Sequence, residues 1–324
     1  MHPVRASLSL LAAALAGSFA LATAQAQDFP SKPIKIIVPI APGGVGDIVS
    51  RAFAAKLGEG GGPSVVVENR AGAAGVVGAD AVAKSPADGY TLMLGFHSVL
   101  SIMPHLTKLP YDPTKDLTPV VHLVSVPNIL IVHPSVPAKD VKELVAYAKA
   151  NPGKLSYASQ GVGTTGHIAG ELFKLANGVD ITHVPYKGAA PAAQDLMAGH
   201  VSMLFDVVSL AAGPIKEGRV RAIGVATKER STALPDVPTL TEQGQPIEIT
   251  AWFGLVAPAG TPPAAIAWIN REANKAFSTP ESRGRFTNTG ATMPLGSADT
   301  FGAFINAETR KFGEVIRKAN IKIE

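Results

Sequence analysis

Short apolar runs typical of buried strands alternate with helix-like stretches along most of the chain, and this alternation limits the possible folds more than any other feature. The expected strands are residues 34–40, 64–68, 90–95, 128–133, 154–159, 181–186, 201–206 and 219–226. The expected helices are residues 47–58, 76–85, 138–151, 167–177, 191–199, 263–277 and 298–319. Alternating strands and helices form largely parallel sheets covered by helices. We therefore predict an α/β fold.

The chain also resembles itself at a fixed offset of 120 residues. The segment KIIVPIAPGGVGDIVSRAFAAKLG (35–58) aligns with LSYASQGVGTTGHIAGELFKLANG (155–178), and several glycines coincide. In both segments a strand leads through a glycine loop into a helix. Short repeats predict a solenoid, whereas one copy in each half of the chain predicts two similar lobes.

Two extended segments are suited to cross between such lobes. Pro119–Pro127 leads out of the first lobe, and Val220–Thr227 leads back. Two crossings form a hinge, and the cleft between hinged lobes is a preferred ligand site. The expected limits are 27–123 and 223–324 for lobe 1 and 124–222 for lobe 2, with the C-terminal helix a candidate to pack across onto lobe 2.

Residues 1–26 have the pattern of a secretory signal peptide. Arg5 precedes an apolar run from Leu8 to about Ala24, and Ala24-Gln25-Ala26 is a small-x-small cleavage pattern. The alternatives are a disordered apolar tail and a membrane span, but a span needs about 20 apolar residues and does not end in a cleavage site. We expect an exported, periplasmic, soluble protein that is cleaved near Ala26.

Composition excludes several classes of function. The chain has no cysteine, which excludes disulfides, thiol nucleophiles and cysteine metal sites. Its eight histidines lack metal-site spacing. The net charge is +4, and the basic residues are scattered singly, without the clusters that bind nucleic acid. We expect no metal, no cofactor and no nucleic acid partner.

The two glycine loops are the strongest candidates for ligand contact. A helix N-terminus offers unpaired N–H groups and about half a positive charge, and glycine lets a ligand approach the backbone closely. Together these features form an anion site that needs no arginine. The candidate residues are Ala41, Pro42, Gly43, Gly44 and Asp47 in the first loop and Gly163, Thr164, Thr165 and His167 in the second. Asp47 is equally suited to cap its helix.

The second loop also contains a formal dinucleotide fingerprint, Gly161-Val162-Gly163-Thr164-Thr165-Gly166. The fingerprint requires an acidic residue at the end of the next strand. Asp180 has about the right separation but precedes that strand. A nucleotide enzyme is therefore disfavoured. A hydrolase is disfavoured as well, because the chain has no G-x-S-x-G elbow.

Ordered motifs over nearly the whole mature chain resemble one family. They are FPSKPIKIIVPIAPGGVGD (29–47), VVVENRAGAAG (65–75), DGYTLMLG (88–95), LPYDPTKDLTPV (109–120), ANPGKLSYASQGVGTTGHIA (150–169), HVPYKGAAPAAQDLMAGHV (183–201), LPDVPT (234–239) and APAGTP (257–262). The chain resembles the receptors of tripartite tricarboxylate transporters, also called Bug-type solute receptors. The resemblance implies a two-lobed type II periplasmic binding protein fold with a hinge and an interlobe cleft. It also implies a small carboxylate ligand and, as partners, the membrane components of the transporter.

Further cleft candidates lie where ligands bind in open α/β sheets, at the carboxyl ends of strands. They are His97, Ser98, Asn128, Ser159, Tyr186 and Asp206. The segment FHSVLSIMP (96–104) departs from the family's more polar pattern, so Phe96 and His97 are expected to reshape the pocket. Trp252-Phe253 is expected to close the core.

These observations predict a periplasmic receptor that captures a small carboxylate and delivers it to a tripartite tricarboxylate-type membrane transporter. We expect a monomer without catalytic residues. Two alternatives remain open, a periplasmic receptor of a signalling system and, more remotely, an exported α/β enzyme.

Overall fold

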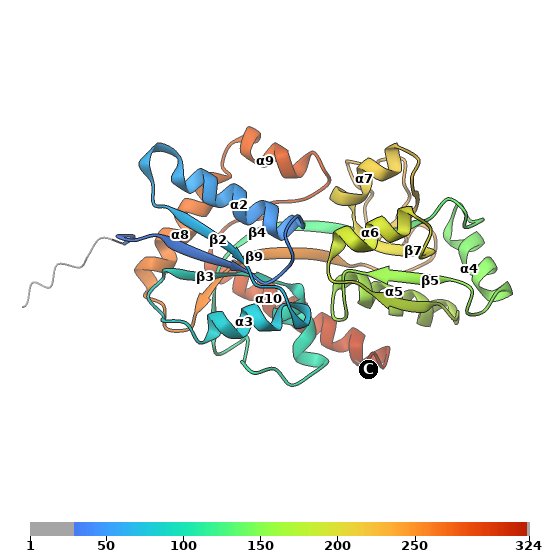
Figure 1. The fold of residues 1–324 in the computed structure, drawn as a ribbon, viewed down its shortest axis with the longest axis horizontal. Helices are drawn as coiled ribbons and strands as arrows, with labels where there is room; N and C mark the ends of the chain where they lie inside the picture. Colours follow the sequence, from blue (N-terminus) through green and yellow to red (C-terminus); the bar gives the residue numbers. More distant parts are fainter. Residues whose placement is uncertain (1–28, 323–324) are drawn as a thin grey trace, which may run out of the picture. The chain divides into compact units, whose positions relative to one another are not determined.

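One long strand, β4 (Leu117–Val132), runs through the fold and belongs to both halves of a nine-stranded sheet. Its first part pairs with the antiparallel strand β9 (Thr250–Pro258), and its second part pairs with β7 (Met203–Val207) and β8 (Arg221–Val225). Figure 1 shows β4 and β9 side by side between the two halves. The strand order is β2-β1-β3-β9-β4 in the first half and β4-β7-β5-β6 in the second, where β8 also pairs with β4.

The computed structural model describes residues 29–322. The chain divides into a unit that ends at Ser31 and a unit that comprises Lys32–Glu324, and all that follows concerns the second unit. The expected signal peptide and its cleavage near Ala26 lie outside the described residues.

The first half is built from parallel strands joined by helices. Its elements before β4 are β1 (Ile34–Val38), α2 (Val45–Gly58), η1 (Glu59–Gly61), β2 (Val65–Asn69), η2 (Ala73–Gly75), α3 (Val76–Ala83), β3 (Thr91–Phe96), η3 (Ser98–Ile102) and η4 (Met103–His105). Its elements after β9 are α8 (Pro263–Ala276), α9 (Pro280–Thr287) and α10 (Ala298–Lys318). Apolar residues such as Ile36, Val38 and Leu92 are fully buried in the strands, as expected for a sheet covered on both faces.

The second half repeats the alternation. Between β4 and β8 it contains α4 (Val141–Ala150), β5 (Ser156–Ser159), α5 (Thr165–Asn177), β6 (Thr182–Pro185), α6 (Ala189–Met197), β7 and α7 (Val208–Lys216). Local signals explain where α5 begins and ends. The Thr164 hydroxyl caps its N-terminus, and Gly178 adopts a left-handed conformation at its C-terminus.

Helix α10 contributes to the core of the second half. Its residues Phe312 and Ile316 are buried in the cluster that contains Leu130 of β4 and Phe173 of α5. The same helix contacts β4 and η3. The lobe limits at residues 123/124 and 222/223 stay predictions.

The segment Val220–Thr227, expected as the return crossing, packs with strands and core residues of the second half. This segment forms β8, which pairs with β4 in the second half, and Val220 and Val225 are buried in a core cluster of that half. The strand that returns to the first half is β9, which the sequence analysis did not predict. No described helix combines the length and apolarity that crossing a bilayer requires.

Candidate functional site

The first glycine loop, residues 41–44, leads from β1 into α2. No side chain caps the N-terminus of α2, whose N-cap residue is Gly44. Asp47 instead accepts a hydrogen bond from the Gly43 N–H at 3.1 Å and fixes the loop from within the helix. Among the described residues, the N–H groups of Val45 and Gly46 form no hydrogen bond. The start of α2 therefore keeps free donors.

Asp47 has its own partners and does not line a described cavity. Its carboxylate is paired with Arg51 at 3.1 Å and accepts a hydrogen bond from Asn69 at 2.9 Å. Burial alone would raise the pKa of Asp47, but the hydrogen bonds from Arg51, Asn69 and the Gly43 backbone outweigh burial and lower it. Asp47 is thus a charged loop-fixing residue.

The second glycine loop, residues 161–164, leads from β5 into α5. The Thr164 hydroxyl donates to the Gly161 carbonyl at 2.7 Å and accepts from the His167 N–H at 3.4 Å. The Gly163 N–H donates to Nδ1 of His167 at 3.2 Å. Burial, as the largest effect, lowers the pKa of His167, which keeps its ring neutral and able to accept this bond. The loop is therefore fixed from within its helix, as the first loop is.

Thr165 differs from Thr164 in the use of its hydroxyl. Thr165 Oγ1 accepts a hydrogen bond from Asn128 Nδ2 at 3.2 Å, which leaves its own O–H available as a donor. The N–H groups of Thr165 and Gly166 form no hydrogen bond with the described residues. The start of α5 thus offers two N–H groups and a hydroxyl.

Four helices begin at one cavity of about 190 Å³, which we call the central cavity. The residues that precede α2, α5, α6 and α7 are Gly44, Thr164, Gly188 and Val207, and all four line it. Only the helix ends of α2 and α5 were expected from the sequence. The structure adds α6 and α7, so the positive ends of four helix dipoles meet there. Such an arrangement favours an anion without any cationic side chain.

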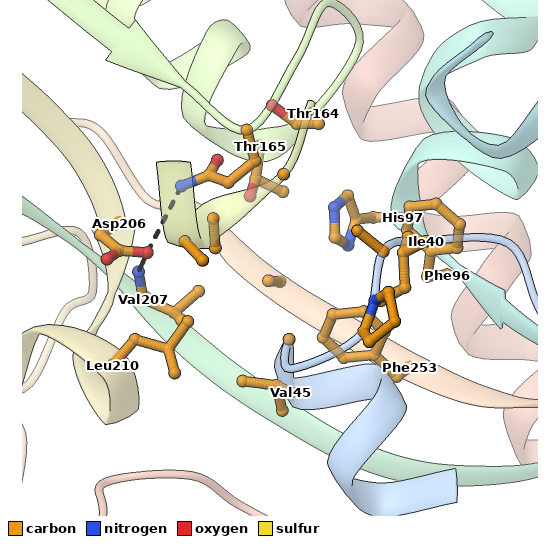
Figure 2. A pocket seen from close by; sticks show the side chains of 18 of the residues that line it. Ile40, Val45, Phe96, His97, Thr164, Thr165, Asp206, Val207, Leu210 and Phe253 are labelled. Carbon is orange, nitrogen blue, oxygen red and sulfur yellow. Dashed lines mark hydrogen bonds between the residues drawn. The ribbon is translucent and has the colours of Figure 1, made fainter. Parts of the chain in front are cut away.

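Apolar side chains form most of the wall of the central cavity (Figure 2). Phe96, His97 and Phe253 lie on one side, and Val207 and Leu210 lie on the opposite side. Burial lowers the pKa of His97 to about 3, against a smaller opposing effect of its hydrogen bond with the Trp252 backbone. His97 is therefore a neutral ring at physiological pH.

Asp206 is the one acidic residue among the described residues that line the central cavity. Its Oδ1 accepts from the Val207 N–H at 2.8 Å and from Gln160 Nε2 at 3.4 Å, the latter drawn in Figure 2. Burial nevertheless raises the pKa of Asp206 to about 6. The charge of this carboxyl therefore changes within the physiological range.

The structure separates the sequence-predicted residues into three groups. The central cavity is lined by Ala41, Pro42, Gly44, His97, Thr164, Thr165 and Asp206. Tyr186 lines an adjoining cavity of about 850 Å³, and Gly43 lines a third cavity beside α6 and α7. The remaining residues lie behind these walls: Asp47, Ser98, Asn128, Ser159, Gly163 and His167.

The residues behind the walls hold the loops. Ser159 Oγ lies 2.7 Å from His183 Nε2 and accepts from the Gly161 N–H at 3.2 Å. Ser98 Oγ donates to the Gly163 carbonyl at 2.8 Å, which joins η3 of the first half to the second loop. Tyr186, which lines the adjoining cavity, donates its phenol proton to Asp195 at 2.6 Å.

Several residues of the central cavity were not predicted from the sequence. They are Ile40, Val45, Gln160, Gly188, Ala189, Ala190, Pro191, Val207, Leu210 and Ala251. Phe253 was expected in the core. It is buried, with 7% of its surface exposed, and it also lines the central cavity. Position at a strand end was the available signal for Gln160, Gly188 and Val207, since each follows or ends a strand that leads to the cleft.

The central and adjoining cavities lie next to each other and share part of their lining. Both are lined by Ile40, Ala41, Phe96, Gln160, Thr164 and Gly188. The described residues contain no cluster of histidine, aspartate and glutamate able to hold a metal ion. The site is thus a cleft of helix ends, hydroxyls and apolar side chains.

Residues 49–321 match the family of the tripartite tricarboxylate transporter family receptor. The chain belongs to this family. Protein BugT of Bordetella pertussis is 38% identical over 309 residues, which cover 94% of each chain. The family assignment expected from the motifs is confirmed.

Solved structures of family members share the fold. The R. palustris protein Rpa4515, solved with adipate, has a TM-score of 0.87 and 35% identity over 91% of this chain and 99% of that one. The periplasmic binding protein BugD has a TM-score of 0.84 and 32% identity over 91% of this chain and 100% of that one. The two-lobed fold of periplasmic binding proteins is therefore confirmed, and the family and its structural neighbours are solute-binding receptors.

Proposed function

We propose that this receptor captures a small carboxylate in the central cavity and delivers it to the membrane components of a tripartite tricarboxylate-type transporter. One observation supports the carboxylate above all: four helices begin at one cavity. The N–H groups of Val45, Gly46, Thr165 and Gly166 have no other described partner. A carboxylate accepts about four hydrogen bonds, and Val45 and Thr165, which line the central cavity, can each donate a backbone N–H to a ligand there.

The capture mechanism follows from the position of the two loops. Loop 41–44 belongs to the first half and loop 161–164 to the second, so a carboxylate held by both loops joins the halves. Charge-assisted hydrogen bonds are about twice as strong as neutral ones. The ligand head thereby stabilises the closed arrangement of the cleft.

A binding screen tests this proposal. Purified protein is heated with mono-, di- and tricarboxylates, sugars, amines and divalent cations, and hits are confirmed by titration calorimetry. We expect stabilisation only by carboxylates, with micromolar or tighter dissociation constants, which corresponds to about −8 kcal/mol. Hits confined to sugars or cations refute the proposal.

The remaining functional expectations are part of the same proposal. The protein acts in the periplasm after cleavage near Ala26, works as a monomer and catalyses no reaction on its ligand. Mass spectrometry of the exported chain tests the cleavage site, and light scattering tests the monomer. The protein is incubated with a ligand that it binds, and chemical analysis of the recovered ligand tests whether it has been converted.

A further inference from the structure

Asp206 is a buried carboxyl in a cavity where four helices begin. The starts of α2 and α5 present free backbone N–H groups at Val45 and Thr165, and α6 and α7 begin at the same cavity. Asp206 is the only acidic residue in the described lining (Figure 2), and it is 2% exposed. The cavity therefore combines several hydrogen-bond donors with one buried carboxyl.

The two oxygens of Asp206 have different surroundings. Oδ1 accepts from the Val207 N–H at 2.8 Å and from Gln160 Nε2 at 3.4 Å. Oδ2 accepts no hydrogen bond from the described residues and is not fully enclosed by them, so it borders open space. Oδ1 thus holds the start of α7, and Oδ2 is available to a ligand.

Asp206 lies close to the start of α5, where we propose that the carboxylate of the ligand binds. Gln160 Nε2 donates to the Phe205 carbonyl at 2.9 Å as well as to Asp206. A Cβ on Gly166, in the first turn of α5, would lie 2.5 Å from Gln160 Oε1 and 2.7 Å from the Phe205 carbonyl. The first turn of α5 therefore packs against Gln160 and Phe205, and Asp206 is the next residue along β7. A substituent near the carboxylate of a bound ligand can thus reach Asp206.

A hydroxyl group suits Oδ2 better than an ammonium group does. A hydroxyl donates to an ionised carboxylate and accepts from a protonated one, so it can bind Asp206 in both forms. Both forms are relevant because burial raises the pKa of Asp206 to about 6. The positive ends of four helix dipoles oppose a cation in the cavity, and removing an ammonium from water costs far more than removing a hydroxyl. The cavity therefore favours an uncharged donor.

We propose that Asp206 binds a hydroxyl group of the ligand and makes this receptor selective for hydroxylated carboxylates. The proposal rests on the function proposed above and narrows it to one class of carboxylate. The hydroxyl lies near the carboxylate that the starts of α2 and α5 bind. The number of carboxylates on the ligand is not part of the distinction, since four helix ends meet at the cavity.

Titration calorimetry with the mature chain at neutral pH tests the selection with three sets of acids. Each set contains a hydroxy acid, its unsubstituted counterpart and its amino counterpart. The sets are lactate, propionate and alanine; malate, succinate and aspartate; and mandelate, phenylacetate and phenylglycine. In every set with measurable binding, we expect the hydroxy acid to bind about tenfold or more tightly than the unsubstituted acid, equivalent to about 1.4 kcal/mol, and more tightly than the amino acid.

The other outcomes of this comparison are distinct. Equal or tighter binding of the unsubstituted acids overturns the selection but leaves the proposed function intact. Tightest binding of the amino acids shows that Asp206 pairs with a cation, which also overturns the selection alone. If no acid of any set binds, both the selection and the proposed function are overturned.

Two substitutions of Asp206 separate its contact with the ligand from its support of α7. Asparagine keeps an oxygen for the Val207 N–H and presents an amide N–H to a hydroxyl, so Asp206→Asn should retain the preference for the hydroxy acid. Asp206→Ala has neither group, and we expect its affinities for the hydroxy and unsubstituted acids to agree within about twofold. An unchanged preference in Asp206→Ala overturns the proposal. The comparison of acids on the unmodified protein does not depend on the folding of these variants.

Leu210 provides a matched control, because it lines the same two cavities as Asp206 and its side chain has no polar atom. Leu210→Ala should weaken the binding of the hydroxy and unsubstituted acids to a similar extent, so the ratio of their affinities stays unchanged. If this ratio falls as far in Leu210→Ala as in Asp206→Ala, the shape of the wall sets the selectivity and the proposal is overturned.

Discussion

Two neighbouring threonines at the start of α5 use their hydroxyls differently. Thr164 uses its hydroxyl within the loop, as donor to Gly161 and acceptor from His167. Thr165 accepts from Asn128 and keeps its proton for a ligand. The sequence offered both threonines as candidates, and only the hydrogen-bond partners distinguish them.

Thr165→Val is therefore expected to weaken carboxylate binding by about tenfold or more, because a hydrogen bond to a charged group contributes about 1.5–3 kcal/mol. Thr165→Ser keeps the hydroxyl and should retain most of the affinity. Thr164→Val should instead lower the free energy of unfolding by about 1 kcal/mol, since it removes a helix cap. Calorimetric titration and thermal unfolding of the three variants measure both effects. Equal affinity of Thr165→Val and Thr165→Ser contradicts the assignment.

Asp206 makes binding dependent on pH. Burial raises its pKa to about 6, and His97, the other titratable residue in the described lining, remains neutral because its pKa is about 3. A bound carboxylate opposes the ionisation of Asp206 further, so binding above pH 6 requires uptake of a proton. Affinity is expected to fall as pH rises from 6 to 8, by about tenfold per pH unit at most.

Asp206→Asn should remove this dependence, because asparagine still accepts from the Val207 N–H and carries no charge. Calorimetry in buffers of different ionisation enthalpy reports the proton uptake directly. The same slope in the variant and the unmodified protein assigns the pH dependence to another group.

At the scale of elements, three stacked rings lie beneath the second glycine loop. His183 of β6 stacks on Tyr157 of β5 at 4.6 Å and on His167 of α5 at 4.6 Å. Burial, as the largest cause, lowers the pKa of His183 to about 4. The stack therefore requires neutral histidines, and protonation of His167 at Nδ1 removes the acceptor of the Gly163 N–H.

Stability is expected to fall as pH decreases from about 6.5 to about 4. In this range the unfolded chain binds a proton at His183 that the folded protein does not bind, which costs on the order of 2 kcal/mol. Above pH 6.5 the neutral His183 makes its full contribution to the free energy of unfolding. Urea unfolding at a series of pH values measures the slope. His183→Gln should reduce the slope but not abolish it, because the pKa values of His97 and His122 are also lowered, to about 3 and about 4. An unchanged slope in this variant contradicts the argument.

The self-resemblance of the sequence identified the two loops because glycine is required at matching places. Gly43 and Gly163 both have positive φ, 88° and 76°. A Cβ on Gly46 would lie 2.5 Å from Leu94, and one on Gly166 would lie 2.7 Å from the Phe205 carbonyl. Residues other than glycine are thus disfavoured at these four positions, either by the backbone conformation or by close packing. Such a requirement for glycine can be recognised in the sequence because it repeats at matching positions of the two loops.

The parts of the site that the sequence did not reveal depend on tertiary contacts. Helices α6 and α7 reach the central cavity because β5, β6 and β7 end at the same edge, yet α7 was not predicted at all. Phe253 lines the cavity because β9 pairs with β3 and β4, and the pairing of distant strands leaves no local pattern. The sequence likewise does not reveal which groups form hydrogen bonds with the hydroxyls of Thr164 and Thr165.

At the scale of the whole Lys32–Glu324 unit, paired strands, the packing of α10 and a hydrogen bond from η3 join the halves. The paired strands β4 and β9 form a continuous link, with register partners from Leu117 to Pro127. Across the cleft, a hydrogen bond of 2.8 Å runs from Ser98 to the Gly163 carbonyl. The strands run continuously through both halves, whereas the Ser98 bond depends on η3 lying against the second loop. Closure of the cleft is therefore stabilised by this bond as well as by the ligand.

Ser98→Ala is expected to weaken ligand binding about three- to tenfold, because one net hydrogen bond contributes about 0.5–1.5 kcal/mol to the closed state. The change should appear mainly as faster dissociation, since most affinity differences between variants of one complex lie in the dissociation rate. Ser101→Ala is the matched control, because Ser101 lies in the same element but pairs with Thr309 of α10 at 2.9 Å. Stopped-flow dissociation of a saturating carboxylate ligand compares the two variants. If both dissociate at the rate of the unmodified protein, the Ser98 bond does not contribute to closure, and the ligand head alone holds the two loops together.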